Sequence, residues 1–149
     1  MTKIDLEAAY RETRYSIFID GIEYAVGVEG TVPDEVDNLL HHSKSKTGVI
    51  LTAWNPRSEV LLSEENQKRN HALLSSLNVK GYEVYEALGR GSDPTWQAEE
   101  SFFVLGLDDN AAHALAVEYG QNAYVSVHKG GPVLLVFSST WDDGSSDQG

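Results

Sequence analysis

Hydrophobic and polar positions recur with two different periods along the chain, and each change of period marks the border of an expected element. Alternation every two residues, or a short apolar run, predicts a strand, and apolar positions three and four residues apart predict a helix. The pattern predicts helices over residues 4–11, 33–42, 63–80 and 108–119. It predicts strands over residues 14–19, 22–28, 48–54, 82–88, 101–107, 123–127 and 133–137.

The order of these elements predicts a fold class. From residue 48 onward the order is strand, helix, strand, strand, helix, strand and one further strand, which contains the βαββαβ order of ferredoxin-like proteins. We therefore expect an α+β fold with a ferredoxin-like βαββαβ core, an N-terminal β-hairpin and an extra C-terminal strand. Another α+β sandwich built from the same elements is the alternative. We expect a single domain over residues 1–138 and a disordered, acidic, Gly- and Ser-rich tail over residues 139–149.

Several residues predict local boundaries. Asn55 precedes a proline, a position that disfavours helical backbone, so Asn55 is expected to be extended at the end of a strand. Ser63 is expected to cap the long helix, and Asp108 or Asp109 the helix that follows. Residues 89–94 are expected to form a loop between two strands.

The helix expected over residues 63–80 carries two amides on its apolar side. At 100° per residue, Asn66 and Asn70 fall on the same stripe as three leucines. Buried amides need partners, because each polar group left unpaired costs about 1–3 kcal/mol. We therefore expect Asn66 and Asn70 to be buried, with Asn55, Gln121 or Asn122 among their neighbours. Such a cluster either stabilises the fold as a structural polar network or lines a functional site.

Other polar residues map onto the same edge of the expected sheet. In a ferredoxin-like sheet, this edge holds the end of the first strand, the start of its helix, and the starts of the third and fourth strands. Glu99 is the candidate general base, because burial beside apolar residues raises the pKa of a carboxyl group toward neutrality. The candidate binding residues are Trp54, Asn55, Arg57, Asn66, Asn70, Arg90, Trp96, Ser101, Gln121 and Asn122.

Composition narrows the classes of function. The 149 residues include no cysteine, which excludes disulfides, thiolate metal sites and a cysteine nucleophile. The net charge of −12 opposes binding to nucleic acids and to anionic membranes, but leaves open a small anionic ligand held by local arginines. No apolar run is long enough for a membrane span, and the N-terminus lacks the apolar core of a signal peptide. A cytoplasmic location is therefore expected.

No motif in the chain predicts a cofactor or a metal ion. His41 and His42 are adjacent and the other three histidines stand alone, so none has the spacing of a metal site. Residues 89–91 resemble half of a phosphate-binding turn, but a third glycine and a following helix are missing. We expect no metal and no cofactor.

Five motifs together resemble a known family. They are Tyr10-x-x-Thr13-x-Tyr15, TAWNP at Thr52–Pro56, the N-x-x-x-N of Asn66 and Asn70, W-x-x-E-x-S at Trp96–Ser101, and G-Q-N-A at Gly120–Ala123. In this order they are similar to a bacterial family called domain of unknown function 3293, and the likeness spans nearly the whole chain. The resemblance implies a small bacterial intracellular domain and supports these residues as a set. It implies no particular chemistry.

Two functions remain open at this point. The first is an enzyme or binding domain for a small polar or anionic molecule, in which the amides hydrogen-bond the ligand, Arg57 and Arg90 hold an anionic group, and Trp54 or Trp96 stacks against a flat ring. The second is a non-catalytic protein-interaction module whose buried amides only stabilise the fold, with no particular partner indicated. A concave, wet cluster of polar groups favours the first, and a tight, dry network favours the second.

Overall fold

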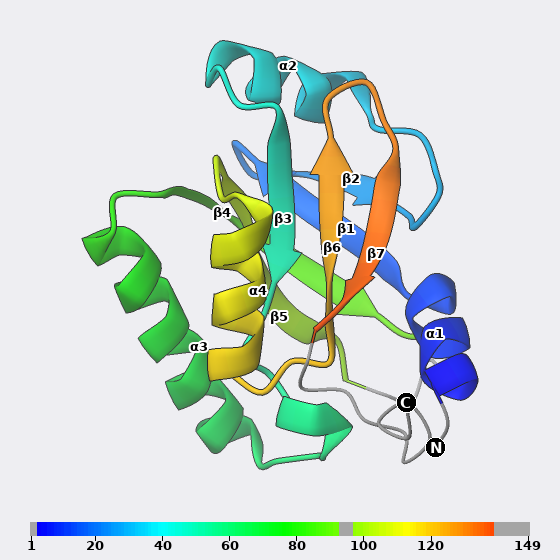
Figure 1. Ribbon diagram of the computed structural model, residues 1–149, viewed down its shortest axis with the longest axis vertical. Coiled ribbons are helices and arrows are strands. Elements are labelled where there is room, and N and C mark those ends of the chain that lie inside the picture. Colours follow the sequence, from blue (N-terminus) through cyan, green and yellow to red (C-terminus); the bar gives the residue numbers. More distant parts are fainter. Residues whose placement is uncertain (1–2, 93–96, 139–149) are drawn as a thin grey trace.

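The strands of this chain form one antiparallel sheet with helices on both of its faces (Figure 1). The computed structural model describes residues 3–92 and 97–138, and within them seven strands follow the order β2-β1-β4-β5-β3-β6-β7. The α+β class expected from the sequence is confirmed. In chain order the elements are α1 (Lys3–Glu12), β1 (Arg14–Ile19), β2 (Ile22–Val26), α2 (Asp34–His42), β3 (Thr47–Leu51), the 3₁₀ turn η1 (Pro56–Ser58), α3 (Ser63–Val79), β4 (Glu83–Arg90), β5 (Glu99–Leu105), α4 (Asp109–Glu118), β6 (Ala123–His128) and β7 (Val133–Phe137).

The N-terminal hairpin extends the sheet rather than flanking it. Strand β1 pairs with β2 on one side and with β4 on the other, and all the pairings of the sheet are antiparallel. Strands β3 to β6 lie in the order β4-β5-β3-β6, so β3 and β5 are the inner two of these four strands. Strand β7 pairs with β6 and forms the opposite edge from β2.

Helices α3 and α4 cover one face of the sheet. Leu73 and Leu77 of α3 and Leu115 of α4 are buried in one cluster with Val49 of β3 and Val104 of β5. The two leucines of α3 are four residues apart and therefore lie on the same side of the helix. Burying each leucine stabilises the fold by about 1.5–3 kcal/mol, which holds the C-terminal half of α3 against the sheet.

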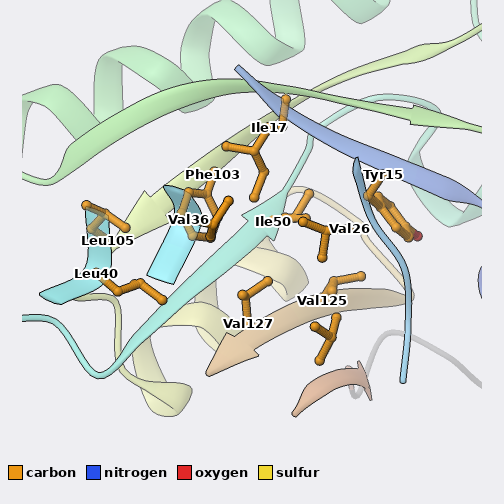
Figure 2. Packing of buried hydrophobic residues seen from close by; sticks show 12 residues of the cluster. Tyr15, Ile17, Val26, Val36, Leu40, Ile50, Phe103, Leu105, Val125 and Val127 are labelled. Carbon is orange, nitrogen blue, oxygen red and sulfur yellow. The ribbon is translucent and has the colours of Figure 1, made fainter. Parts of the chain in front are cut away.

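Helix α2 packs against the other face. Its residues Val36 and Leu40 are fully buried in a second cluster that includes Ile50 and Phe103 (Figure 2). Gly48 leaves room for the Phe103 ring, since a Cβ at this position would lie 2.3 Å from Phe103 Cζ. The central strands are thus packed tightly at the α2 end of the sheet.

The sheet curls until its two edges approach each other. Val26 of the edge strand β2 and Val133 of the edge strand β7 are buried in the same cluster. The backbone N–H of Glu29, just after β2, donates a hydrogen bond of 2.9 Å to the carbonyl oxygen of Val133. This curl encloses one face of the sheet, and α1 lies at one end of the curled structure (Figure 1).

Two expected features around β3 are wrong. The strand ends at Leu51 instead of residue 54, because the backbone after it bonds to side chains of α3 rather than to a neighbouring strand. Asn55 is not extended but lies in the left-handed region, with φ 44° and ψ 68°. Asparagine tolerates this conformation, and here Asn55 Oδ1 accepts a 3.0 Å hydrogen bond from the backbone N–H of Leu61.

Other boundaries also differ from the sequence expectation. Ser63 does not cap α3 but is its first residue, and its hydroxyl donates to Gln97 Oε1 at 3.2 Å. Asp108 does cap α4, since its side chain accepts from the backbone N–H of Ala111 at 2.8 Å. Strand β4 continues to Arg90, so the start of the expected loop over residues 89–94 is strand. The remainder of that loop and the tail over residues 139–149 lie partly or wholly outside the described residues.

Candidate functional site

Asn70 joins α3 to the two central strands at the point where they separate. Its Oδ1 accepts a hydrogen bond of 2.7 Å from the backbone N–H of Ala53, and its Nδ2 donates one of 2.6 Å to the carbonyl oxygen of Glu100. The hydroxyl of Thr52 lies 3.2 Å from the same Oδ1. The Asn70 amide therefore supplies the bonds that a neighbouring strand would otherwise make.

Asn66 holds the next segment in the same way. Its Oδ1 accepts from the backbone N–H of Asn55, and its Nδ2 donates to the side-chain Oδ1 of Asn55, both at 2.8 Å. Asn66 is 1% exposed and Asn70 is 5% exposed. The expectation that both amides are buried, with Asn55 among their neighbours, is confirmed.

The turn before β6 closes onto this segment from the other side. Gln121 Nε2 donates to the carbonyl oxygen of Trp54 at 3.1 Å, and the backbone N–H of Arg57 donates to the carbonyl oxygen of Gly120 at 2.6 Å. Arg69 of α3 adds a hydrogen bond of 2.8 Å from Nε to the carbonyl oxygen of Ala53. Residues 52–57 are thus fixed between α3 and the turn that carries Gln121.

A cavity of about 480 Å³ lies beside this network, between α1, the end of β4, the start of β5 and the turn before β6. Five residues expected at the site line it, namely Asn55, Glu99, Ser101, Gln121 and Asn122. Its apolar wall includes Ile50 and Val125 from the enclosed face of the sheet. Asn66 and Asn70 are not among the lining residues, because their amides face the backbone of residues 52–61 and of Glu100.

Three adjacent strands form one side of the cavity. Tyr15 of β1 pairs with Gly89 of β4, and Gly89 pairs with Glu99 of β5. Residues directly opposite in an antiparallel pair project from the same face, so Tyr15 and Glu99 lie on either side of a position without a side chain. A Cβ at Gly89 would lie 3.4 Å from Tyr15 Cε1, which is ordinary contact. The glycine thus leaves space between the Tyr15 ring and the Glu99 carboxyl group.

Glu99 is the carboxyl group in the cavity lining whose pKa is shifted by burial. Burial raises the pKa of the Glu99 carboxyl group from 4.5 to about 7. Within the described part of the chain, this carboxyl group accepts no hydrogen bond. A carboxylate that loses water without gaining a partner is costly to ionise, which is the physical cause of the raised pKa.

Two tyrosines share the environment of Glu99. Burial raises the pKa of Tyr10 and of Tyr15 above the usual range, and the negative charge of Glu99 raises both further. Tyr15 lies at the margin of the aliphatic cluster, with its hydroxyl directed away from the aliphatic side chains (Figure 2). Its hydroxyl also has a hydrogen bond with the side chain of Thr13. Both phenols therefore stay neutral while Glu99 titrates.

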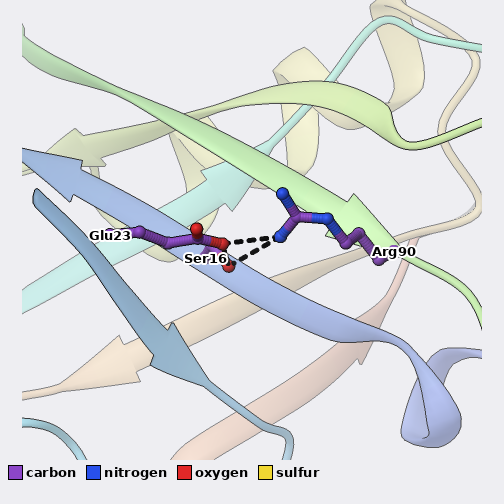
Figure 3. Close-up of polar contacts among 3 residues, drawn as sticks. All are labelled: Ser16, Glu23 and Arg90. Atoms are coloured by element: carbon purple, nitrogen blue, oxygen red, sulfur yellow. Dashed lines mark hydrogen bonds and ion pairs between the residues drawn. The ribbon is translucent and has the colours of Figure 1, made fainter. Parts of the chain in front are cut away.

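Three other candidate residues, Arg90, Arg57 and Trp54, do not line the cavity. Arg90 ends β4, and its Nη1 lies 2.6 Å from Glu23 Oε2 and 3.3 Å from Ser16 Oγ on the outer side of the hairpin (Figure 3). Arg57 is exposed on η1, and Trp54 is 2% exposed and does not line the cavity. Trp96 lies outside the described residues.

Sequence reasoning assigned no role in the site to Tyr10, Thr13 or Tyr15, although they carry part of the family resemblance. All three line the cavity. One signal was available, because Tyr15 and Ile17 alternate on the inward side of β1 and both are buried. What the chain alone did not indicate is that the curl of the sheet places β1 and α1 beside Glu99.

Metal sites and membrane spans were also sought among residues 3–92 and 97–138. This part of the chain contains no group of three or more His, Asp or Glu side chains that could hold a metal ion. No helix in it has both the length and the apolar character needed to cross a membrane.

Comparison with known proteins gave one match. Residues 51–124 match the model of a family described as protein of unknown function (DUF3293). The matched segment begins at Leu51, the last residue of β3, and ends at Tyr124 near the start of β6, and so includes the amide network, Glu99 and Gln121. Neither the curated proteins nor the solved structures gave a match.

Proposed function

For this chain, which belongs to the DUF3293 family through residues 51–124, we propose that the cavity beside Glu99 binds a small polar molecule. The observation that carries the proposal is the Glu99 carboxyl group, which lines the cavity without a hydrogen-bonding partner among the described residues. The Glu99 side chain is half-buried, and a carboxyl group that is shielded from water without a protein partner calls for an explanation. A ligand that bonds to Glu99 supplies it.

The form of the cavity supports this proposal. Sites for small molecules have volumes of about 300–1,000 Å³ and mostly apolar walls with a few polar groups. Here the volume is about 480 Å³, and the lining combines the apolar side chains of Ile50 and Val125 with the polar residues Glu99 and Gln121. Gln121 Nε2 already donates to carbonyl oxygens, so its Oε1 is the atom that remains to accept from a ligand.

The amide network has a separate, structural part in the proposal. Asn66 and Asn70 fix residues 52–55 and thereby hold Asn55 at the edge of the cavity. Rigid support of this kind keeps a binding site in its productive geometry, because the lining residues need not be ordered when the ligand binds. In this proposal the two amides position the site and do not contact the ligand.

A screen of small molecules by thermal shift and by two-dimensional NMR tests the proposal. The panel contains nucleotides, sugar phosphates, amino acids and amines. Gly89→Leu serves as the blocking variant, because its side chain enters the space between Tyr15 and Glu99. Ligands of the cavity should shift the resonances of Tyr15 and Ser101 and should lose affinity for Gly89→Leu. Ligands that bind the folded variant equally well, or that shift only distant resonances, would show that the cavity is not the site.

A pKa near 7 also suits a general base, because such a group changes protonation state easily at physiological pH. A catalytic role for Glu99 stays a prediction. It requires that a bound molecule turn over, and that Glu99→Gln remove turnover while leaving binding of a neutral ligand intact.

A protein-interaction module is the second candidate function. It is favoured by Val60 and Leu62, which are 73% and 71% exposed on the segment before α3. Val60 also lines the cavity, so a partner could cover the opening. The double change Val60→Ser and Leu62→Ser should abolish capture of such a partner and leave small-molecule binding largely unchanged. If that change removes the response to small molecules as well, the two surfaces are one site.

We also infer that residues 47–128 form a ferredoxin-like core. The strand order β4-β5-β3-β6 is the order in which the second, third, first and fourth strands of such a core lie side by side. Both helices of this unit, α3 and α4, pack on the same face, as the arrangement requires. An experimental structure with crossover connections of the opposite hand would refute this inference.

A further inference from the structure

We infer that the molecule bound beside Glu99 is a small organic cation, a protonated amine on an apolar body, with its ammonium group against the Glu99 carboxylate. The inference rests on the proposed function, since it names the chemical class of ligand for the same cavity. It also replaces the anionic ligand that the sequence favoured, because the two arginines on which that expectation depended lie elsewhere.

The first argument for a cationic ligand is the sign of the charges around the cavity. Among the described residues that line it, the charged ones are Glu12 and Glu99, and none is a lysine, arginine or histidine. Arg90 is engaged with Glu23, and Arg11 of α1 pairs with carboxylates at 2.9 Å on the outer surface. An anionic ligand would therefore face two carboxylates with no cation to offset them, whereas an ammonium ion meets charge of the opposite sign.

The second argument is the presence of two tyrosine rings in the cavity lining. Tyr10 and Tyr15 reach the cavity from α1 and β1, close enough for the charge of Glu99 to affect both phenols. The face of a tyrosine ring attracts a cation, and the attraction is stronger where water is excluded. A carboxylate with neighbouring tyrosine rings suits an ammonium group better than it suits a neutral alcohol or an anion. The aliphatic side chains of Ile50 and Val125 suit an apolar body.

The third argument is the proton balance of binding. Where Glu99 is protonated, the ammonium ion displaces the carboxyl proton to solvent, and an N–H···O bond to the carboxylate forms in its place. The titratable groups that face Glu99 are Tyr10 from α1 and Tyr15 from β1, both neutral, while β4 contributes Gly89 and the turn before β6 contributes amides. Glu12 lies at the exposed rim, 3.3 Å from Ser92 Oγ. The affinity for a cation should therefore follow the titration of Glu99.

Three molecules with the same ring and different charge test the inference. Benzylammonium, benzyl alcohol and benzoate are titrated into the full chain, followed by NMR, between pH 5 and pH 8. We expect benzylammonium to bind at least about tenfold more tightly than benzyl alcohol at pH 8, a difference of about 1.4 kcal/mol. Benzoate should bind more weakly than either. Below the Glu99 pKa, the dissociation constant of benzylammonium should fall about tenfold for each unit by which the pH rises. Above this pKa it should become independent of pH.

Two variants of neighbouring residues provide the control. Glu99→Gln should remove both the preference for benzylammonium and its pH dependence, while keeping the binding of benzyl alcohol. Glu100→Gln should change neither, because the Glu100 side chain is exposed and projects from the opposite face of β5. If Glu99→Gln does not fold, Glu99→Asp retains the charge and should shift the pH profile without abolishing the preference.

The outcomes separate this inference from the proposed function. Equal binding of the three molecules, or tighter binding of benzoate, would refute the cationic class and leave the cavity as a small-molecule site. A preference for benzylammonium that persists in Glu99→Gln would show that another group binds the cation. If none of the three binds, the cationic class is wrong, and the broader screen with Gly89→Leu decides separately whether the cavity binds small molecules.

Discussion

Removing the charge of Glu99 should stabilise the protein at neutral and alkaline pH. The pKa of this carboxyl group is raised by burial from 4.5 to about 7, so between these values the folded protein holds a proton that the unfolded chain has lost. The stabilising contribution of the protonated group is fully present below pH 4.5 and is lost as the pH rises through about 7. Glu99→Gln has nearly the same shape and no charge to bury, so it should not suffer this loss.

The magnitude follows from the two pKa values. The interval from 4.5 to about 7, at about 1.4 kcal/mol for each pH unit, amounts to about 3 kcal/mol. The free energy of unfolding of the two proteins should therefore be similar at pH 4. At pH 8 Glu99→Gln should be more stable by about 3 kcal/mol, and most of the difference should develop between pH 5 and pH 7.

Urea unfolding followed by circular dichroism, at fixed ionic strength and at pH intervals from 4 to 8, measures this difference. Other groups titrate in the same range, but they do so equally in both proteins and cancel from the comparison. Glu100→Gln is the matched control and should show no pH-dependent difference from the parent chain. If Glu99→Gln is equally stable or less stable at pH 8, the carboxylate has a favourable partner, and the reasoning about an unpaired group is wrong.

Three further predictions concern the packing and the partners. Asn70→Leu should lower the free energy of unfolding by about 1–3 kcal/mol in urea titrations, since it leaves the buried N–H of Ala53 unpaired; stability like that of the parent would contradict this role. Gly48→Ala should cost about 1–3 kcal/mol because of the Phe103 ring, whereas Gly89→Ala should cost much less, and equal melting temperatures would refute the comparison. The chain should not bind DNA or RNA at physiological ionic strength, given its net charge of −12, and a salt-dependent gel shift at micromolar protein would overturn this.

The sequence predicted those features that depend on local periodicity. The strands and helices repeat at two and 3.6 residues, and Asn66 and Asn70 could be expected inside because they lie in register with leucines. The backbone of Asn55 was not predictable in this way. Its left-handed conformation is accompanied by bonds to Leu61 and to Asn66, the second of which requires α3 to lie against this segment. Tertiary contacts there override the local preference of a residue before proline.

The cavity was predicted in part, for a similar reason. Glu99, Ser101 and Gln121 could be placed at one edge from the order of the elements, and they do line the cavity. Arg90 could not be placed, because the extension of β4 to this residue and its pairing with Glu23 depend on where the N-terminal hairpin joins the sheet. The same long-range pairing brings Tyr15 to the cavity, and no local pattern in the chain encodes it.

The backbone hydrogen bond from Glu29 to Val133 has a consequence for how the protein folds. It joins the segment after the first hairpin to the last strand, so it can form only when all the strands between these two edges are in place. Contacts between residues so distant along the chain form slowly, because the entropy of closing a long loop must be overcome first. The β4–β5 and β6–β7 hairpins can form early from neighbouring residues, whereas the closure of the curl between the segment after β2 and β7 is expected in a late step. The chain is thus expected to form its hairpins before it joins the two edges of the sheet.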